Sequence, residues 1–217
     1  MNDYRAILNR VGMVLIAIGI LDIAYWIYCI SQGQNYSSSF NFPAVVAGVF
    51  LLRGNLRAVP IITWFAVFML SNFVSGIILI PFLQPADLWA TQFRLNLVGL
   101  PMSLLAKIMP IPVLFWLYAQ LRAAPVASAS IRYGNSGFNP KLAFILGIAI
   151  AILPVGMMHL TRTGAAGVKA VEIARAKYGE NYKYHLTSIY WSNGNVKANL
   201  TAYNEQEIKP VQVEWKD

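Results

Sequence analysis

The chain has 217 residues, of which 57% are hydrophobic and only 12% charged, and its mean hydropathy is +0.52. Soluble domains carry about 25% charged residues, so these apolar side chains exceed what one water-facing core would bury. The net charge of +8 does not indicate nucleic-acid binding, because the tail from residue 164 is close to neutral, with seven basic and six acidic residues. We expect an integral membrane protein in contact with the lipid bilayer and with no nucleic acid.

Apolar runs divide the first 163 residues into five candidate membrane spans. Crossing a hydrocarbon core of about 30 Å takes about 20 helical residues. The second run is short, because its apolar part is only 42–52, and it spans only if residues 36–40 enter the headgroup region. The fourth contains Pro101, Pro110 and Pro112, which predict a kink near its middle. The expected spans are about 11–30, 36–52, 58–83, 97–121 and 142–160.

Residues 85–97 differ from the flanking runs. Pro85 and Asp87 are suited to start a helix, and Leu88, Trp89, Phe93 and Leu97 would form its apolar stripe. Two interpretations remain open: an interfacial helix at the membrane surface, or a loop with an aromatic anchor.

Loop charges predict the orientation of the chain. With the N-terminus inside, the inner segments hold seven Lys/Arg residues, and the outer segments hold only Arg94 and Arg162. If the second run were re-entrant, only four spans would remain, and Arg122, Arg132 and Lys141 would lie outside. Five spans are therefore favoured. We expect a bacterial inner (plasma) membrane protein with a cytoplasmic N-terminus and a periplasmic C-terminal domain.

Residues 164–217 predict a small extramembrane α+β domain. An Ala-rich helix over 165–177 ends before Gly179. Alternating runs at 182–191 and 196–203 flank Asn193-Gly194, a dipeptide typical of type I′ hairpin turns, and 208–215 is suited to a third strand. The expected fold class is a membrane all-α bundle of about five transmembrane helices plus this domain of one helix and a three-stranded antiparallel meander.

Asp22 and Lys107 are the only charges well inside the predicted spans. Helix counting places both roughly 10–15 Å below the outer surface, where an unpaired charge costs at least ~2.5–3.5 kcal/mol. We therefore expect an intramembrane charge pair. A structural link between two helices is preferred, while a proton or ion pathway and separate snorkelling to the interface remain alternatives.

The sequence contains no catalytic motif and no metal-binding pattern. Cys29 is the only cysteine, which excludes an internal disulfide, and His159 and His185 have no second ligand at metal spacing. Phosphate-loop, dinucleotide, zinc-protease and serine-hydrolase motifs are absent from it. We expect no catalytic residue, no metal and no cofactor.

The preferred function is a non-enzymatic accessory or anchoring subunit, whose outer domain binds another protein of a membrane assembly or a second copy of the chain. The last strand is a possible edge for a partner, although Lys209 and Pro210 discourage strand pairing. The alternative is a small transporter or channel component that uses Asp22 and Lys107. The candidate interaction surface comprises Tyr190, Trp191, Tyr203, Val211, Val213 and Trp215.

Overall fold

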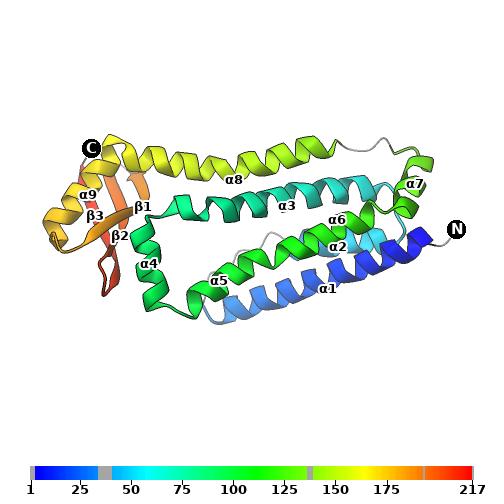
Figure 1. Cartoon of the computed structure of the whole chain (residues 1–217), viewed down its shortest axis with the longest axis horizontal. Helices are drawn as coiled ribbons and strands as arrows, with labels where there is room; N and C mark the ends of the chain where they lie inside the picture. The colour runs from blue at the N-terminus through cyan, green and yellow to red at the C-terminus, as the bar shows by residue number, and fades with distance from the viewer. Residues whose placement is uncertain (1–2, 34–40, 136–138, 193, 217) are drawn as a thin grey trace. The chain divides into compact units, whose positions relative to one another are not determined.

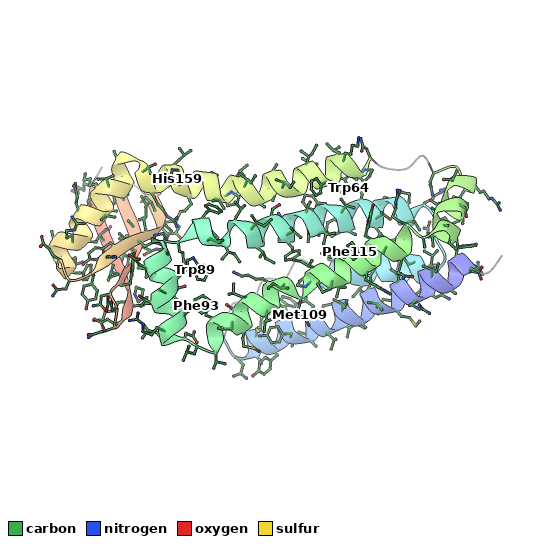
Figure 2. All side chains as sticks on the ribbon, viewed as in Figure 1. Trp64, Trp89, Phe93, Met109, Phe115 and His159 are labelled. Atoms are coloured by element: carbon green, nitrogen blue, oxygen red, sulfur yellow. The ribbon has the colours of Figure 1, made fainter. Side chains whose placement is uncertain are left out.

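Four helices in the computed structural model are long and apolar enough to cross a membrane. The structure describes residues 3–33, 41–135, 139–192 and 194–216 (Figure 1). In the most apolar stretch of each of the four, only 11–17% of the residues are buried; Met109 and Phe115, for example, are 68% and 62% exposed (Figure 2). Apolar surface of this extent is typical of helices that face lipid. The four helices are α1 (Asp3–Ser31), α3 (Ala58–Leu83), the pair α5 (Gly99–Ile108) and α6 (Pro110–Leu121), and α8 (Pro140–Thr163).

The fifth predicted span is not confirmed. Helix α2 (Asn41–Leu52) has 12 residues, which amounts to about 18 Å of helix, and residues 36–40 of the predicted span lie outside the described residues. The fourth run is interrupted at Met109, between α5 and α6, near the middle where the kink is predicted. Contacts group the chain into two compact units, Met1–Ser71 with Ile111–Gly147 and Asn72–Pro110 with Ile148–Asp217. A domain boundary at residue 163 stays a prediction.

In the first unit, α1 and α2 pack with their backbones in close approach. A Cβ atom added to Gly48 would lie 2.6 Å from the carbonyl oxygen of Gly12, and one added to Gly12 would lie 2.8 Å from that of Gly48. Small residues allow such contact between membrane helices. The turn after α2 returns to the start of α1, since a Cβ on Gly54 would lie 3.6 Å from Nε of Arg5.

Between the fourth and fifth predicted spans lies helix α7 (Ala124–Arg132), which contacts α1. Pro125 is suited to its first turn. The chain after α7 is joined to the turn before α3, because Asn135 Nδ2 donates a hydrogen bond of 2.8 Å to the Leu56 carbonyl. The Arg57 guanidinium also lies 5.7 Å from the centre of the Tyr133 ring.

The second unit contains the predicted antiparallel meander. Strands β1 (Lys183–Ser192), β2 (Asn195–Tyr203) and β3 (Ile208–Lys216) form a sheet in that order, and α9 (Ala165–Tyr178) lies on one face (Figure 1). Gly179, at φ +97°, follows α9, and Gly194, at φ +74°, lies in the β1–β2 turn; Asn193 lies outside the described residues. The buried core between α9 and the sheet consists of Ala170, Ala174, Leu186, Ala198, Leu200 and Val213.

Strand β1 contains a bulge that changes which residues face α9. Leu186 pairs with Leu200, but Ser188 pairs with Asn199, so one extra residue lies between them in β1. Before the bulge, Tyr184 and Leu186 pack on the α9 side; after it, Ile189 takes that side. The even-numbered alternation that the sequence predicts therefore ends at residue 186.

Candidate interaction surface of the C-terminal domain

The α8–α9 corner is tight and gives the domain a close attachment to the membrane helix before it. Gly164, in an extended conformation, precedes α9. A Cβ on Gly167 would collide with the backbone carbonyl oxygens of Thr161 and Arg162. Glycine at 167 is thus required for the first turn of α9 to pack against the last turn of α8.

Arg162, at the end of α8, binds two backbone carbonyls from distant parts of the second unit. Its Nε donates to Leu186 of β1 at 3.0 Å, and its Nη1 donates to Leu83, the last residue of α3, at 2.8 Å. Hydrogen bonds from a charged donor contribute about 1.5–3 kcal/mol each. Arg162 therefore ties the sheet to the ends of two apolar helices.

His185 is buried beside this arginine, with 7% of its surface exposed. Burial, reinforced by the positive charge of Arg162, lowers the pKa of His185 to about 4, although a hydrogen bond to the Leu83 backbone acts in the opposite direction. The imidazole is neutral at pH 7, and its Nε2 is buried with no hydrogen bond among the described residues. A neutral histidine fits this position because a second cation beside Arg162 would be costly.

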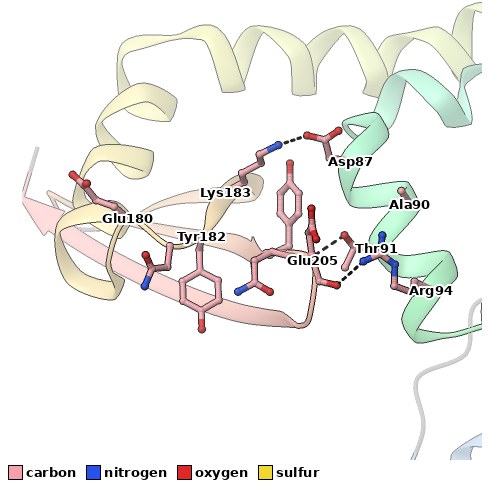
Figure 3. Close-up of a pocket in the computed structure, with 11 residues that line it drawn as sticks. Asp87, Ala90, Thr91, Arg94, Glu180, Tyr182, Lys183 and Glu205 are labelled. Carbon is pink, nitrogen blue, oxygen red and sulfur yellow. Dashed lines mark hydrogen bonds and ion pairs between the residues drawn. The ribbon is translucent and has the colours of Figure 1, made fainter.

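Helix α4 (Ala86–Leu95) packs against the turn between β2 and β3. Leu88 and Thr91, one helical turn apart, are 1% and 5% exposed. Thr91 donates to the Asn204 carbonyl at 3.3 Å, and Arg94 donates to the Glu205 carbonyl at 3.0 Å (Figure 3). The segment 85–97 therefore contains a helix, while its position at a membrane surface stays a prediction.

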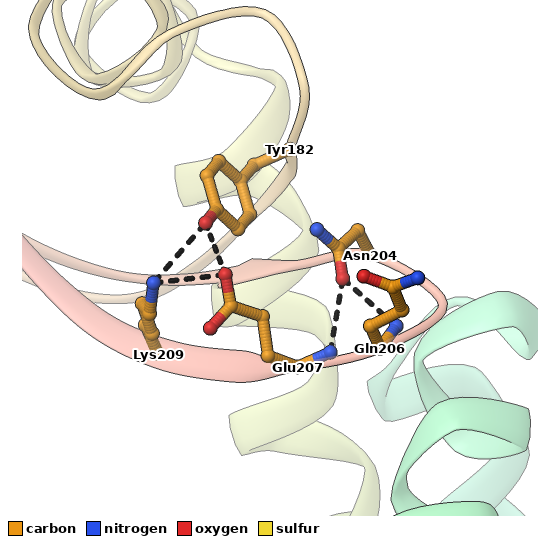
Figure 4. Close-up of polar contacts among 5 residues, drawn as sticks. All are labelled: Tyr182, Asn204, Gln206, Glu207 and Lys209. Carbon is orange, nitrogen blue, oxygen red and sulfur yellow. Dashed lines mark hydrogen bonds and ion pairs between the residues drawn. The ribbon is translucent and has the colours of Figure 1, made fainter.

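The turn that receives α4 is itself well ordered by hydrogen bonds. The Asn204 side chain accepts the backbone N–H groups of Gln206 and Glu207, both at 2.9 Å (Figure 4). Tyr182 donates to the Glu207 carboxylate, and Lys209 binds that carboxylate at 2.8 Å. These contacts hold the turn in the shape that presents its carbonyls to α4.

An open pocket of about 450 Å³ lies where α4 meets the domain, and charges of both signs line it (Figure 3). Asp87 pairs with Lys183, and both side chains are well exposed; such surface pairs contribute about 0–1 kcal/mol. Burial raises the pKa of Tyr203, so its hydroxyl stays protonated at neutral pH. The lining includes no Ser, Cys or His. Thr91 and Arg94 of this lining also make the contacts between α4 and the β2–β3 turn.

The edge of the sheet at β3 is poorly suited to a partner strand. Pro210 has no N–H to donate, and the carbonyl of Gln212 already accepts a hydrogen bond of 2.9 Å from the Tyr178 hydroxyl. The predicted use of the last strand as the partner edge thus has little support in the structure.

The other edge, at β1, presents two adjacent aromatic side chains. In the described sheet β1 pairs only with β2. Tyr190 and Trp191 are 59% and 58% exposed, and neighbouring residues of a strand point to opposite faces. The half of β1 beyond the bulge therefore has an aromatic side chain on each face, and along its side away from β2 no strand of the described residues pairs with it.

The remaining predicted interaction residues lie inside the domain. Val213 and Tyr203 are 1% and 4% exposed, and Val211 and Trp215 pack against the core. Lys169 of α9 lies over the Trp215 ring at 5.6 Å. A partner at the domain surface would thus reach Tyr190 and Trp191 first.

The predicted intramembrane pair is divided between the two units. Asp22 is half-buried on α1 in the first unit, and Lys107 is exposed on α5 in the second. Their pairing stays a prediction. Among the described residues, no group of three or more His, Cys, Asp or Glu side chains is placed to hold a metal ion; the expectation of no cofactor also stays a prediction.

Sequence reasoning missed the contacts of Arg162 with Leu83 and Leu186, the burial of His185 beside it, and the contacts of Thr91 and Arg94 with the β2–β3 turn. Only Arg162 was marked by its local sequence, because it is a cation just after an apolar run. Comparison with known proteins adds no relative, because no family model, curated protein or solved structure matches the chain.

Proposed function

We propose that the chain is a non-enzymatic accessory or anchoring subunit of a membrane assembly. Its C-terminal domain binds another protein along the half of β1 beyond the bulge. The observation that carries this proposal is the exposed Tyr190–Trp191 pair on an unpaired sheet edge. Adding a strand to such an edge is a common mode of peptide recognition, and tyrosine and tryptophan are frequent hot spots of binding energy.

The contacts of the second unit support a domain held firmly for binding. Arg162 and the α4 contacts attach the sheet to helices of the same unit, and the α8–α9 corner attaches α9 to α8. A fixed domain loses less freedom when it binds than a tethered one does. The arrangement therefore favours an anchoring role.

The proposed location is a bacterial inner membrane, with the domain on the periplasmic side. Support comes from the loop charges, seven inside against two outside. Support also comes from the turn after α2, which lies beside Arg5 at the start of α1. If α1 and α2 are two crossings, the three later apolar helices bring the total to five, an odd number. A transporter or channel role for Asp22 and Lys107 is the alternative.

Site-specific photo-crosslinking in cells tests this function. A photoreactive amino acid at 190 or 191 of the full chain is expected to capture one protein in stoichiometric yield, whereas the same group at Glu172, exposed on α9, is expected to capture none. Trp191→Ala should weaken partner binding at least tenfold without changing the unfolding temperature. Equal capture from position 172, or no capture from 190 and 191, would contradict the proposal.

A further inference from the structure

An apolar groove of about 480 Å³ lies between α2 and the first half of α3, within the first unit. Residues of both helices remain open to the outside, since Ile61 is 57% exposed and Phe50 is 43% exposed. The walls include Val46, Ala47 and Phe50 from α2 and Ile61, Ile62 and Phe65 from α3.

One end of the groove is polar and positively charged. Asn55 and Arg57, in and just after the turn between the two helices, line this end. The backbone N–H of Arg57 donates to Asn55 Oδ1 at 3.0 Å, and its guanidinium lies over the Tyr133 ring at 5.7 Å. The first contact fixes the backbone of Arg57 at this end of the groove, and the second places its guanidinium beside Tyr133.

We propose that this groove binds one acyl chain of an anionic phospholipid and that Arg57 binds the phosphate of its headgroup. From Arg57 the lining continues to Phe65, about 12 Å further along α3, as required for an amphiphile with its head at the turn. Basic pockets between membrane helices commonly bind anionic headgroups. The proposal rests on the membrane location proposed above and is independent of any protein partner at β1.

Charge complementarity favours a lipid over a helix from a second copy. Before residue 164 the chain has only three acidic residues, Asp3, Asp22 and Asp87. A second copy would therefore bring few anions to Arg57, whereas every anionic lipid places a phosphate at the level of the headgroups.

Native mass spectrometry of the purified full chain, titrated with phosphatidylglycerol or phosphatidylcholine, tests the headgroup contact. The unaltered chain is expected to bind one phosphatidylglycerol in preference to phosphatidylcholine. Arg57→Gln should weaken phosphatidylglycerol binding about fivefold, the effect of about one surface cation, and leave phosphatidylcholine binding unchanged. Arg53→Gln is the matched control, because Arg53 is an exposed cation of the same turn that does not line the groove.

A second pair of variants tests the acyl-chain contact. Ile61→Trp fills the groove and should reduce binding of both lipids, whereas Ile78→Trp, at a similarly exposed position of α3 outside the groove, should have no effect. Thermal unfolding verifies that each variant is folded, and Ala47→Phe replaces Ile61→Trp if that chain misfolds. Equal loss of lipid with Arg53→Gln, unchanged binding with Ile61→Trp, or a dimer that only Ile61→Trp dissociates would overturn the proposal.

Discussion

The contact between α1 and α2 gives the sharpest prediction, because glycine is required on both sides of it. Gly48→Ala places a Cβ atom 2.6 Å from the Gly12 carbonyl oxygen and 2.6 Å from Cγ1 of Ile16, whereas ordinary contacts begin at 3.4 Å. The Ile16 side chain is able to rotate away, but the Gly12 carbonyl belongs to the helix backbone. The two helices must therefore separate.

The expected size of the effect follows from two opposing terms. Overpacking a close contact costs about 1–3 kcal/mol, while alanine stabilises a helix by about 0.5–1 kcal/mol relative to glycine. Gly48→Ala should thus lower the free energy of unfolding, by up to about 2.5 kcal/mol. Gly76→Ala is the matched control: Gly76 lies in α3 with no atom within 4 Å of its would-be Cβ, so this change should raise stability.

Unfolding by sodium dodecyl sulfate in mixed micelles, followed by circular dichroism, measures both variants. The two substitutions make the same chemical change, so their opposite signs isolate the contact between helices. If Gly48→Ala stabilises the protein as much as Gly76→Ala does, the close approach of α1 and α2 is refuted.

Three further predictions concern the second unit. Burial lowers the pKa of His185 from 6.5 to about 4, so between these pH values the unfolded chain binds more protons than the folded chain. The free energy of unfolding should therefore be highest above pH 6.5 and fall by up to about 3 kcal/mol as the pH drops to 4. A pH series of unfolding curves measures this dependence, which His185→Asn should abolish. Leu88→Ala should cost about 2–5 kcal/mol, and hydrogen exchange should then increase in the β2–β3 turn; unchanged exchange would contradict the packing of α4 there. Arg162→Lys, which cannot reproduce two divergent N–H donors, should cost about 1–3 kcal/mol, and an unaltered melting temperature would argue against its bridging role.

The C-terminal fold was predictable because its determinants are local. Alternation in three short runs, an Asn-Gly turn and a glycine after an Ala-rich helix all lie within a few residues of the structure they specify. The bulge was not predictable in this way, since alternation alone places Tyr190 on the same face as Leu186. The structure instead places Ile189 on that face, paired with the buried Ala198 of β2.

The contacts that join the elements of the second unit were beyond sequence reasoning for a different reason. Thr91 and its acceptor Asn204 are 113 residues apart, and no spacing rule relates a helix face to so distant a turn. The membrane helices were recognisable from apolar length alone. Segment 42–52 has too few apolar residues for a full span by this length rule, and the predicted number of spans depended on it.

The two hydrogen bonds of Arg162 have a mechanical consequence. A force pulling on β1 passes to α8 through the covalent chain and also to the Arg162 side chain through its bond to Leu186, and Arg162 passes part of it on to α3 through its bond to Leu83. A single tether would let the sheet swivel under load, whereas two separate attachments resist torque. Tension on the domain is thereby shared between two helices and does not simply rotate it about Gly164.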